Sequence, residues 1–191
     1  MELQGSRTEQ NLLAAFAGES QARMRYSFFS SVAKKEGYEQ ISAIFQETAE
    51  NEREHAKLFF AFLTRGTPLE ITAAYPAGVI GNTEENLQAA AEGERFEWST
   101  LYPGFAQVAK EEGFMDVAKT FRVVAKVEVS HDKRYRKLLD NVQKGKVFSR
   151  KTPVSWKCRN CGLVLKASEA PERCPTCDHP RAYYEIFVVP Y

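Results

Sequence analysis

The chain lacks the features that mark secreted, membrane-spanning or nucleic-acid-binding proteins. Its 191 residues carry a net charge of only +1, and the basic residues form no dense block, which argues against an electrostatic nucleic-acid binder. No apolar run approaches the ~20 residues of a membrane span. Residues 1–5 lack the basic and apolar regions of a secretory signal. We therefore expect a cytoplasmic protein with no nucleic-acid or membrane partner.

Cysteine is absent until the last 34 residues, where it forms two Cys-x-x-Cys pairs with twelve residues between them: Cys158, Cys161, Cys174 and Cys177. In a chain without a signal peptide, this spacing indicates a tetrathiolate metal site and not disulfides. The module around it is too small to fold by apolar burial alone, so we expect the metal to stabilise it. From this module alone, a zinc ribbon and an iron site fit about equally well.

Histidine is equally scarce, yet two of the three histidines follow a glutamate at the same spacing. His55 lies three residues after Glu52, and His131 lies three residues after Glu128. On an α-helix, such residues share one face, so each pair can bind one metal ion. One such pair arises easily by chance and is usually a solvated surface pair, whereas two are harder to assign to chance.

The spacing of apolar residues predicts four helices, over about residues 6–36, 38–65, 83–112 and 114–144. Gly37 and Gly113 mark tight joins that predict two antiparallel hairpins, and Gly145 follows the last helix. Between the hairpins, residues 66–82 form the single long crossover expected of a ferritin-like bundle. We expect this bundle to occupy residues 1–147. After a linker over about residues 145–155, short strands are expected in a second domain at residues 153–191.

Each predicted helix carries one glutamate within its apolar stripe: Glu19, Glu52, Glu94 and Glu128. A charged group in a core must be paired or bind metal, and Arg23 is the main basic residue near enough in sequence to pair with one of them. Together with the two histidines, these glutamates form the ligand set of a dinuclear carboxylate bundle. Such a set suits Fe, Mn, Zn and Co, and its oxygen content favours iron or manganese for redox work.

The two halves of the bundle repeat, with one mismatch. Gly37 and Gly113 each precede a ligand glutamate by fifteen residues. Upstream, Glu19 lies eighteen residues before Gly37, whereas Glu94 lies nineteen before Gly113. One inserted residue inside a helix is commonly absorbed as a π-bulge. We therefore predict a π-type irregularity near residues 95–102, which the following Pro103 supports.

Three further side chains are expected near the face of the predicted helices that points into the bundle. Glu97, one turn after Glu94, is a candidate additional ligand, although it could simply be solvated. Tyr26 and Tyr102 could hydrogen-bond to ligand carboxylates or supply a proton or electron, although each could equally be a core tyrosine. We take these three as candidate catalytic residues.

The motifs together resemble the rubrerythrin family over essentially the whole chain. The cysteine knuckles with flanking aromatics such as Trp156 and Tyr184 are similar to rubredoxin, and the segment Ala15–Arg23 and the Glu94-x-x-Glu97 pair are similar to the di-iron bundle. The resemblance implies an all-α ferritin-like four-helix bundle with a small C-terminal rubredoxin-like β/metal-knuckle domain.

The resemblance also implies cofactors, ligands and partners. Two Fe ions would form an oxo/carboxylate-bridged di-iron site, with Glu52 and Glu128 bridging them and with His55 and Glu97 as alternative ligands of one iron. One further Fe ion in an Fe(Cys)4 site would relay electrons. The expected di-iron ligands are Glu19, Glu52, His55, Glu94, Glu97, Glu128 and His131.

The family activity is reduction of hydrogen peroxide to water in oxidative-stress defence. The implied partners are hydrogen peroxide, an electron-donor protein (rubredoxin or an NAD(P)H-dependent reductase) and a second copy of the chain in a head-to-tail homodimer. Two other functions remain open from the sequence: a ferroxidase or iron-storage protein, and a metal-free scaffold whose cysteines hold structural zinc.

Overall fold

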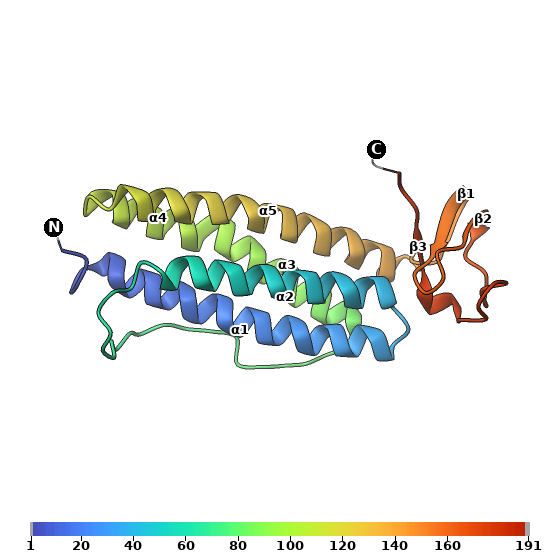
Figure 1. The fold of residues 1–191 in the computed structure, drawn as a ribbon, viewed down its shortest axis with the longest axis horizontal. Helices are drawn as coiled ribbons and strands as arrows, with labels where there is room; N and C mark the ends of the chain where they lie inside the picture. Colours follow the sequence, from blue (N-terminus) through green and yellow to red (C-terminus); the bar gives the residue numbers. More distant parts are fainter. Residues whose placement is uncertain (1, 190–191) are drawn as a thin grey trace.

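The computed structural model describes residues 2–189, and four helical rods form its main body (Figure 1). Residue 1 of the expected bundle and residues 190–191 of the expected second domain lie outside this range. The helices are α1 (Arg7–Lys35), α2 (Glu39–Phe60), α3 (Thr83–Phe96), the π-helix η1 (Glu97–Leu101), α4 (Tyr102–Glu111) and α5 (Met115–Gln143). Because α3, η1 and α4 follow one another without a break, they make one rod. The predicted four-helix bundle is thus confirmed.

The helix ends follow the local chemistry of the sequence. Ser6 accepts a hydrogen bond from the backbone N–H of Glu9 and so caps α1. Gly37 and Gly113 have φ values of +84° and +85°, the left-handed conformation that ends a helix at low cost only for glycine. These two turns make the hairpins α1–α2 and α4–α5. The predicted end of the second helix at residue 65 is wrong, because the helix stops at Phe60 and Arg65 lies beyond it, paired with Glu9.

The predicted π-type irregularity is confirmed, at residues 97–101. There the backbone N–H of Tyr102 donates to the carbonyl of Glu97, five residues earlier. The extra residue widens one turn of this rod, between Glu94 and Tyr102.

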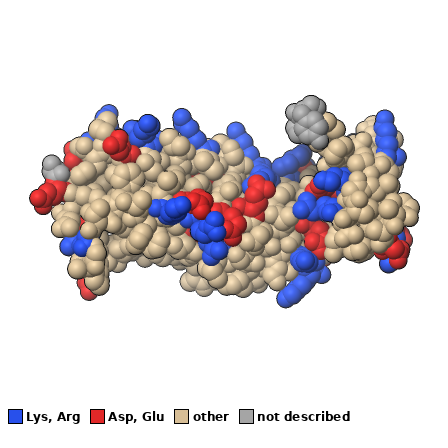
Figure 2. Space-filling model, in the orientation of Figure 1, with Lys and Arg blue, Asp and Glu red and all other residues tan. Residues whose placement is uncertain are grey.

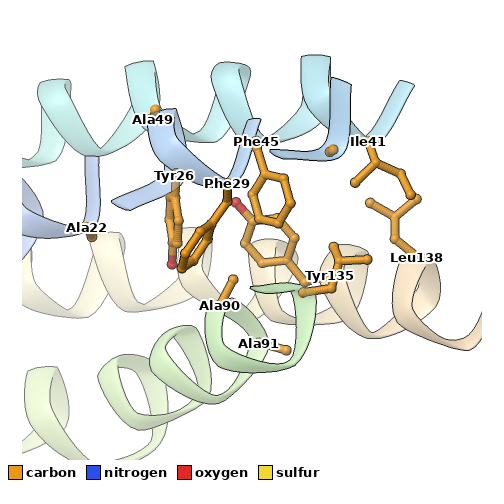
Figure 3. Packing of buried hydrophobic residues seen from close by; sticks show 12 residues of the cluster. Ala22, Tyr26, Phe29, Ile41, Phe45, Ala49, Ala90, Ala91, Tyr135 and Leu138 are labelled. Carbon is orange, nitrogen blue, oxygen red and sulfur yellow. The ribbon is translucent and has the colours of Figure 1, made fainter. Parts of the chain in front are cut away.

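Two apolar clusters fill the bundle, one on each side of a layer of buried glutamates and histidines. The first contains Tyr26, Phe29, Phe45 and Tyr135, whose rings contact one another at centroid distances of 5.1–6.2 Å (Figure 3). The second, nearer the start of α1, includes Phe59, Tyr102 and Phe121. Because both clusters exclude water, the polar layer between them lies in a dry interior.

The C-terminal module is a three-stranded antiparallel sheet in the order β2-β1-β3, with β1 (Ser149–Cys158), β2 (Val164–Glu169) and β3 (Tyr184–Ile186). The expected linker to about residue 155 is wrong in its second half, because β1 begins at Ser149. Its register with β2 shifts between Ser149 and Val154, and this irregularity accommodates Pro153, which has no N–H to donate. Trp156 is fully buried and anchors the module's own small core.

The module lies beyond the end of the bundle where α1 meets α2 and where α5 ends (Figure 1). The rings of Tyr38 and Phe148 stack there at 6.1 Å with an interplanar angle of 7°. On the face shown in Figure 2, Lys and Arg side chains are interspersed with Asp and Glu. None of the described helices combines the length and apolar character that crossing a membrane requires.

One ion pair ties the start of α1 to the chain after α2, and it should make stability depend on pH. Both carboxylate oxygens of buried Glu9 accept from Arg65, at 2.9 and 2.7 Å, and the backbone N–H of Gly5 also donates to Glu9. The hydrogen bonds from Arg65 lower the pKa of Glu9 below its ordinary 4.5, although burial opposes this. A lowered carboxyl pKa stabilises the fold above pH 4.5 and loses that effect as the pH falls through the lowered value.

We expect Glu9→Gln to lower the free energy of unfolding at pH 7 by on the order of 1–2 kcal/mol, because a charged hydrogen-bond acceptor is lost. The difference from wild type should shrink as the pH falls below 4.5. Denaturant unfolding at several pH values measures it, with exposed Glu2→Gln as the matched control. An equal loss at all pH values would contradict the role of the charge.

Candidate metal centres

The structure brings together six of the predicted ligands in the layer between the two apolar clusters. Four of them, Glu19, Glu52, His55 and Glu128, place one ligand atom each within 4.8 Å of one another. The Nδ1 atom of His55 lies 2.7 Å from a carboxylate oxygen of Glu52 and 3.0 Å from one of Glu128. This group takes residues from α1, α2 and α5.

A second group of the same kind lies beside the first. It consists of Glu52, Glu94, Glu128 and His131, again with one ligand atom each within 4.8 Å of one another. The Nδ1 atom of His131 lies 2.8 Å from Glu128 and 3.2 Å from Glu52. Glu52 and Glu128 belong to both groups, so two metal ions bound here would share these two carboxylates as bridges.

The unpaired atoms of this layer fit bound cations. Buried oxygen atoms of all four glutamates, and Nδ1 of both histidines, have no hydrogen bond of good geometry although they converge at short distances. Within residues 2–189, the ion pairs of these glutamates are to histidine alone, and Arg23 pairs with Glu50 at the surface instead. Four carboxylates carry a charge of −4, which two divalent cations would neutralise. The residues therefore form a dinuclear carboxylate–histidine site of the di-iron type.

Without bound metal ions, the glutamates and histidines of this layer shift one another's pKa values. Burial, reinforced by neighbouring carboxylates, raises the pKa values of Glu19 and Glu94 well above the ordinary value. Burial lowers the pKa of the two histidines, but the adjacent Glu128 and Glu52 outweigh it and raise the pKa to about 10 for His55 and about 12 for His131. Without bound metal ions, these four side chains therefore keep their protons to a higher pH than the same groups do in water.

Glu97 lies at the edge of this layer. It is half-buried, and it belongs to neither group of converging ligand atoms. Burial and the charge of Glu94 raise its pKa well above the ordinary value. Its role as a ligand stays a prediction.

The two candidate tyrosines contact ligand carboxylates from opposite sides. The hydroxyl of Tyr26 donates to Glu94, and the hydroxyl of Tyr102 donates to Glu19. Burial raises the pKa of both phenols well above the ordinary value, so both keep their protons at neutral pH. Their catalytic role stays a prediction.

Sequence reasoning missed the residues that orient the ligands. The Oδ1 atom of Asn51 lies 3.3 Å from Nε2 of His131, and the tautomer that donates there leaves Nδ1 free for a metal. Trp98, in η1, donates from Nε1 to buried Asp132 at 3.1 Å and so attaches the π-helix to α5. Asn51 and Trp98 are next to predicted ligands in the sequence, but no spacing pattern in the sequence predicts these two hydrogen bonds.

The four cysteines converge in the C-terminal module, as their spacing predicted. Their sulfur atoms all lie within 4.8 Å of one another, with 3.8 Å between Cys158 and Cys177 and 3.6 Å between Cys161 and Cys174. Disulfide sulfurs lie about 2.05 Å apart, so these are free thiols arranged for one tetrahedral metal. Burial raises the pKa of Cys174, but the nearby Tyr184 hydroxyl and backbone N–H groups lower it to about 6, which favours a thiolate ligand.

Both parts of the chain match families of known proteins. The family model described as "Rubrerythrin" matches residues 10–139, and the model "Rubrerythrin, rubredoxin-like domain" matches residues 156–185. A rubrerythrin of Porphyromonas gingivalis is 60% identical over 183 residues, which cover 96% of this chain and 91% of that protein. A rubrerythrin of Clostridium perfringens is 54% identical over 192 residues, covering 99% and 98%.

Among solved structures, a fully reduced, all-ferrous nigerythrin superposes with a TM-score of 0.63. It is 30% identical, and the match covers 97% of this chain and 91% of that one. The likeness extends over both the bundle and the cysteine module.

Metal removal should make the bundle's stability depend on pH in a defined direction. The pKa values of Glu19, Glu94 and Glu97 are raised, so each destabilises the metal-free fold increasingly as the pH rises above 4.5. The raised pKa values of the two histidines stabilise it fully below pH 6.5 and less as the pH rises towards 10–12. Burial raises the pKa of Glu128, but the two histidines lower it to about 2. Glu128 therefore stabilises the metal-free fold by the same amount at every pH above 4.5.

We therefore expect the metal-free protein to have a lower Tm at pH 8 than at pH 5.5, and the gain in Tm on adding metal to be larger at pH 8. Differential scanning calorimetry of the metal-loaded and chelator-treated protein at both values measures this. A metal-free Tm that rises from pH 5.5 to pH 8 would contradict the assignment.

Proposed function

Since this chain belongs to the rubrerythrin family, we propose that it is an iron-dependent peroxidase that reduces hydrogen peroxide to water in oxidative-stress defence. The bundle would hold two iron ions and the cysteine module one. A cytoplasmic location fits the proposal, because four free thiols persist in a reducing compartment.

The observation that carries this proposal is the pairing of two different metal sites in one chain. The carboxylate–histidine site suits a pair of ions that react with an oxygen substrate, whereas four thiolates suit an ion that exchanges single electrons. A protein that only stored or oxidised iron would need no such relay, because oxidation by oxygen requires no incoming electrons. The relay therefore favours repeated reduction of the substrate.

When bound, the two irons would supply the two electrons that break the O–O bond, and the protein would supply protons and a dry site. Tyr26 and Tyr102 hold protons on hydroxyls that contact Glu94 and Glu19. Glu97 has a raised pKa and lies where the layer reaches the surface, so it can hold a proton for the departing oxygen. Phe59 and Phe121 exclude water from the Tyr102 side.

Electron supply requires a second chain in this proposal. The cysteine module lies at one end of the bundle, whereas the carboxylate layer lies between the two apolar clusters (Figure 1). A head-to-tail homodimer would bring the module of one chain to the bundle of its partner. A rubredoxin or an NAD(P)H-dependent reductase would then reduce the cysteine-bound iron.

Steady-state kinetics test the peroxidase proposal against iron oxidation. With reduced rubredoxin as donor, we expect rapid peroxide consumption in proportion to donor oxidised. Net oxidation of added ferrous iron with mineral formation, without donor-linked peroxide consumption, would identify a ferroxidase instead. A colourless purified protein without iron would exclude both.

Glu97 provides a test of proton delivery. We expect Glu97→Ala to leave the fold intact and to slow peroxide turnover by roughly 10²-fold, the usual contribution of a general acid. Circular dichroism and stopped-flow kinetics check the two parts, with exposed Glu92→Ala on α3 as the matched control. Unchanged turnover in Glu97→Ala would remove Glu97 from the mechanism.

Cys158 tests the relay. We expect Cys158→Ser to stop re-reduction of the oxidised bundle site by reduced rubredoxin, while the bundle keeps its Tm and still reacts once with peroxide after chemical reduction. Ser168→Ala, an exposed change on β2, serves as the control. Normal re-reduction in Cys158→Ser would count against the relay.

A further inference from the structure

A cavity of about 380 Å³ lies between α1, the crossover segment and the region around the π-helix. Its floor includes a stripe of α1 that carries Ala14, Gly18 and Ala22 at a spacing of four residues, so no large side chain rises from this stripe. Residues 71–76 of the crossover form the opposite wall. The cavity thus exists because small residues on α1 face a segment held away from the helix.

Tyr75 holds the crossover in this position. Its hydroxyl donates to the carbonyl oxygen of Ala14 at 2.8 Å. A Cβ atom at Gly18 would lie 3.7 Å from the Tyr75 ring, so the ring also lies over the floor. The wall on the side of the π-helix is apolar and includes Phe96, Leu101 and Phe105. Four polar side chains of α1 also line the cavity: Gln10, Asn11, Gln21 and Arg25.

The inner end of the cavity reaches the proposed reaction site. Tyr26 and Glu97 both line it, and Tyr26 donates to the ligand carboxylate of Glu94. A molecule in the cavity therefore meets two proton-holding groups, Tyr26 and Glu97, and a lining that is otherwise largely apolar, with a few polar side chains from α1.

The cavity is far larger than hydrogen peroxide requires. A water molecule occupies roughly 30 Å³ in the liquid, and hydrogen peroxide is little larger. Cavities of about 300–1,000 Å³ with mostly apolar walls and a few polar groups are typical of sites for organic molecules. The size and the lining indicate a substrate with an apolar group attached to the peroxide.

We propose that the protein also reduces small organic hydroperoxides, with the apolar group in this cavity and the hydroperoxide group directed towards Tyr26 and Glu97. This inference rests on the proposed peroxidase function. The reaction breaks the O–O bond of R–O–O–H, takes up two electrons and two protons, and releases R–OH and water. The electrons come from the same reduced one-electron donor protein that serves hydrogen peroxide.

The kinetic test compares hydrogen peroxide, tert-butyl hydroperoxide and cumene hydroperoxide with the full-length, iron-loaded protein and reduced rubredoxin. We expect turnover of all three, with a higher kcat/KM for cumene than for tert-butyl hydroperoxide because its larger apolar group fills more of the cavity. Ala14→Leu fills the floor and should lower the ratio of kcat/KM for cumene hydroperoxide to that for hydrogen peroxide at least tenfold. Ile71→Trp fills the opposite wall, outside any helix, and should lower the same ratio.

Ala17→Leu is the matched control, because Ala17 is half-buried on the same helix but does not line the cavity. It should leave the ratio unchanged. A second readout does not depend on turnover: 2-phenyl-2-propanol, the alcohol product, should bind to the iron-loaded wild type and to Ala17→Leu in saturation-transfer NMR, and should not bind to Ala14→Leu.

The outcomes separate the two proposals. Turnover of hydrogen peroxide without turnover of either organic hydroperoxide would overturn this inference and leave the peroxidase function intact. Failure to reduce any of the three would overturn both. An equal ratio in wild type, Ala14→Leu and Ile71→Trp, or alcohol binding unaffected by Ala14→Leu, would show that the cavity is not the site.

Discussion

The need to compensate four buried glutamates governs this structure. Glu19, Glu52, Glu94 and Glu128 lie in a water-excluding interior, where uncompensated carboxylates are costly. Among residues 2–189, their ion pairs are to two histidines alone, and the hydroxyls of Tyr26 and Tyr102 donate to one oxygen each of Glu94 and Glu19. A pair of divalent cations would neutralise the remaining charge. The bundle, its two apolar clusters and its tight glycine turns bring the six predicted ligands together in one layer.

The π-helix is the local consequence of this arrangement. One inserted residue places Glu94 in the ligand layer and Glu97 at its edge, while Trp98 fastens the widened turn to α5 through Asp132. The same irregular segment borders the cavity beneath the crossover. In the proposed function, ligand placement, proton supply and access for a substrate would all depend on this one short stretch of helix.

Much of this could be predicted from the sequence, because the decisive features are local or periodic. The Glu-x-x-His spacing, the paired cysteine knuckles and the one-residue mismatch between the halves each have a direct geometric meaning on a helix or a turn. The predictions were wrong or incomplete where a boundary or contact depends on residues far apart in the sequence. The start of β1 depends on its pairing with β2. The place of Arg65 outside α2 goes with its ion pair to Glu9, and the contact of Asn51 with His131 depends on the packing of α2 beside α5.

The central claim is that two metal ions compensate the buried carboxylates. Anomalous diffraction at the iron edge, from crystals of protein produced with ample iron, tests it most directly. The account predicts two peaks per chain inside the bundle, with Glu52 and Glu128 between them, and a third peak among the four cysteine sulfurs. A well-ordered bundle without peaks, in which histidines and glutamates pair only with one another, would contradict it.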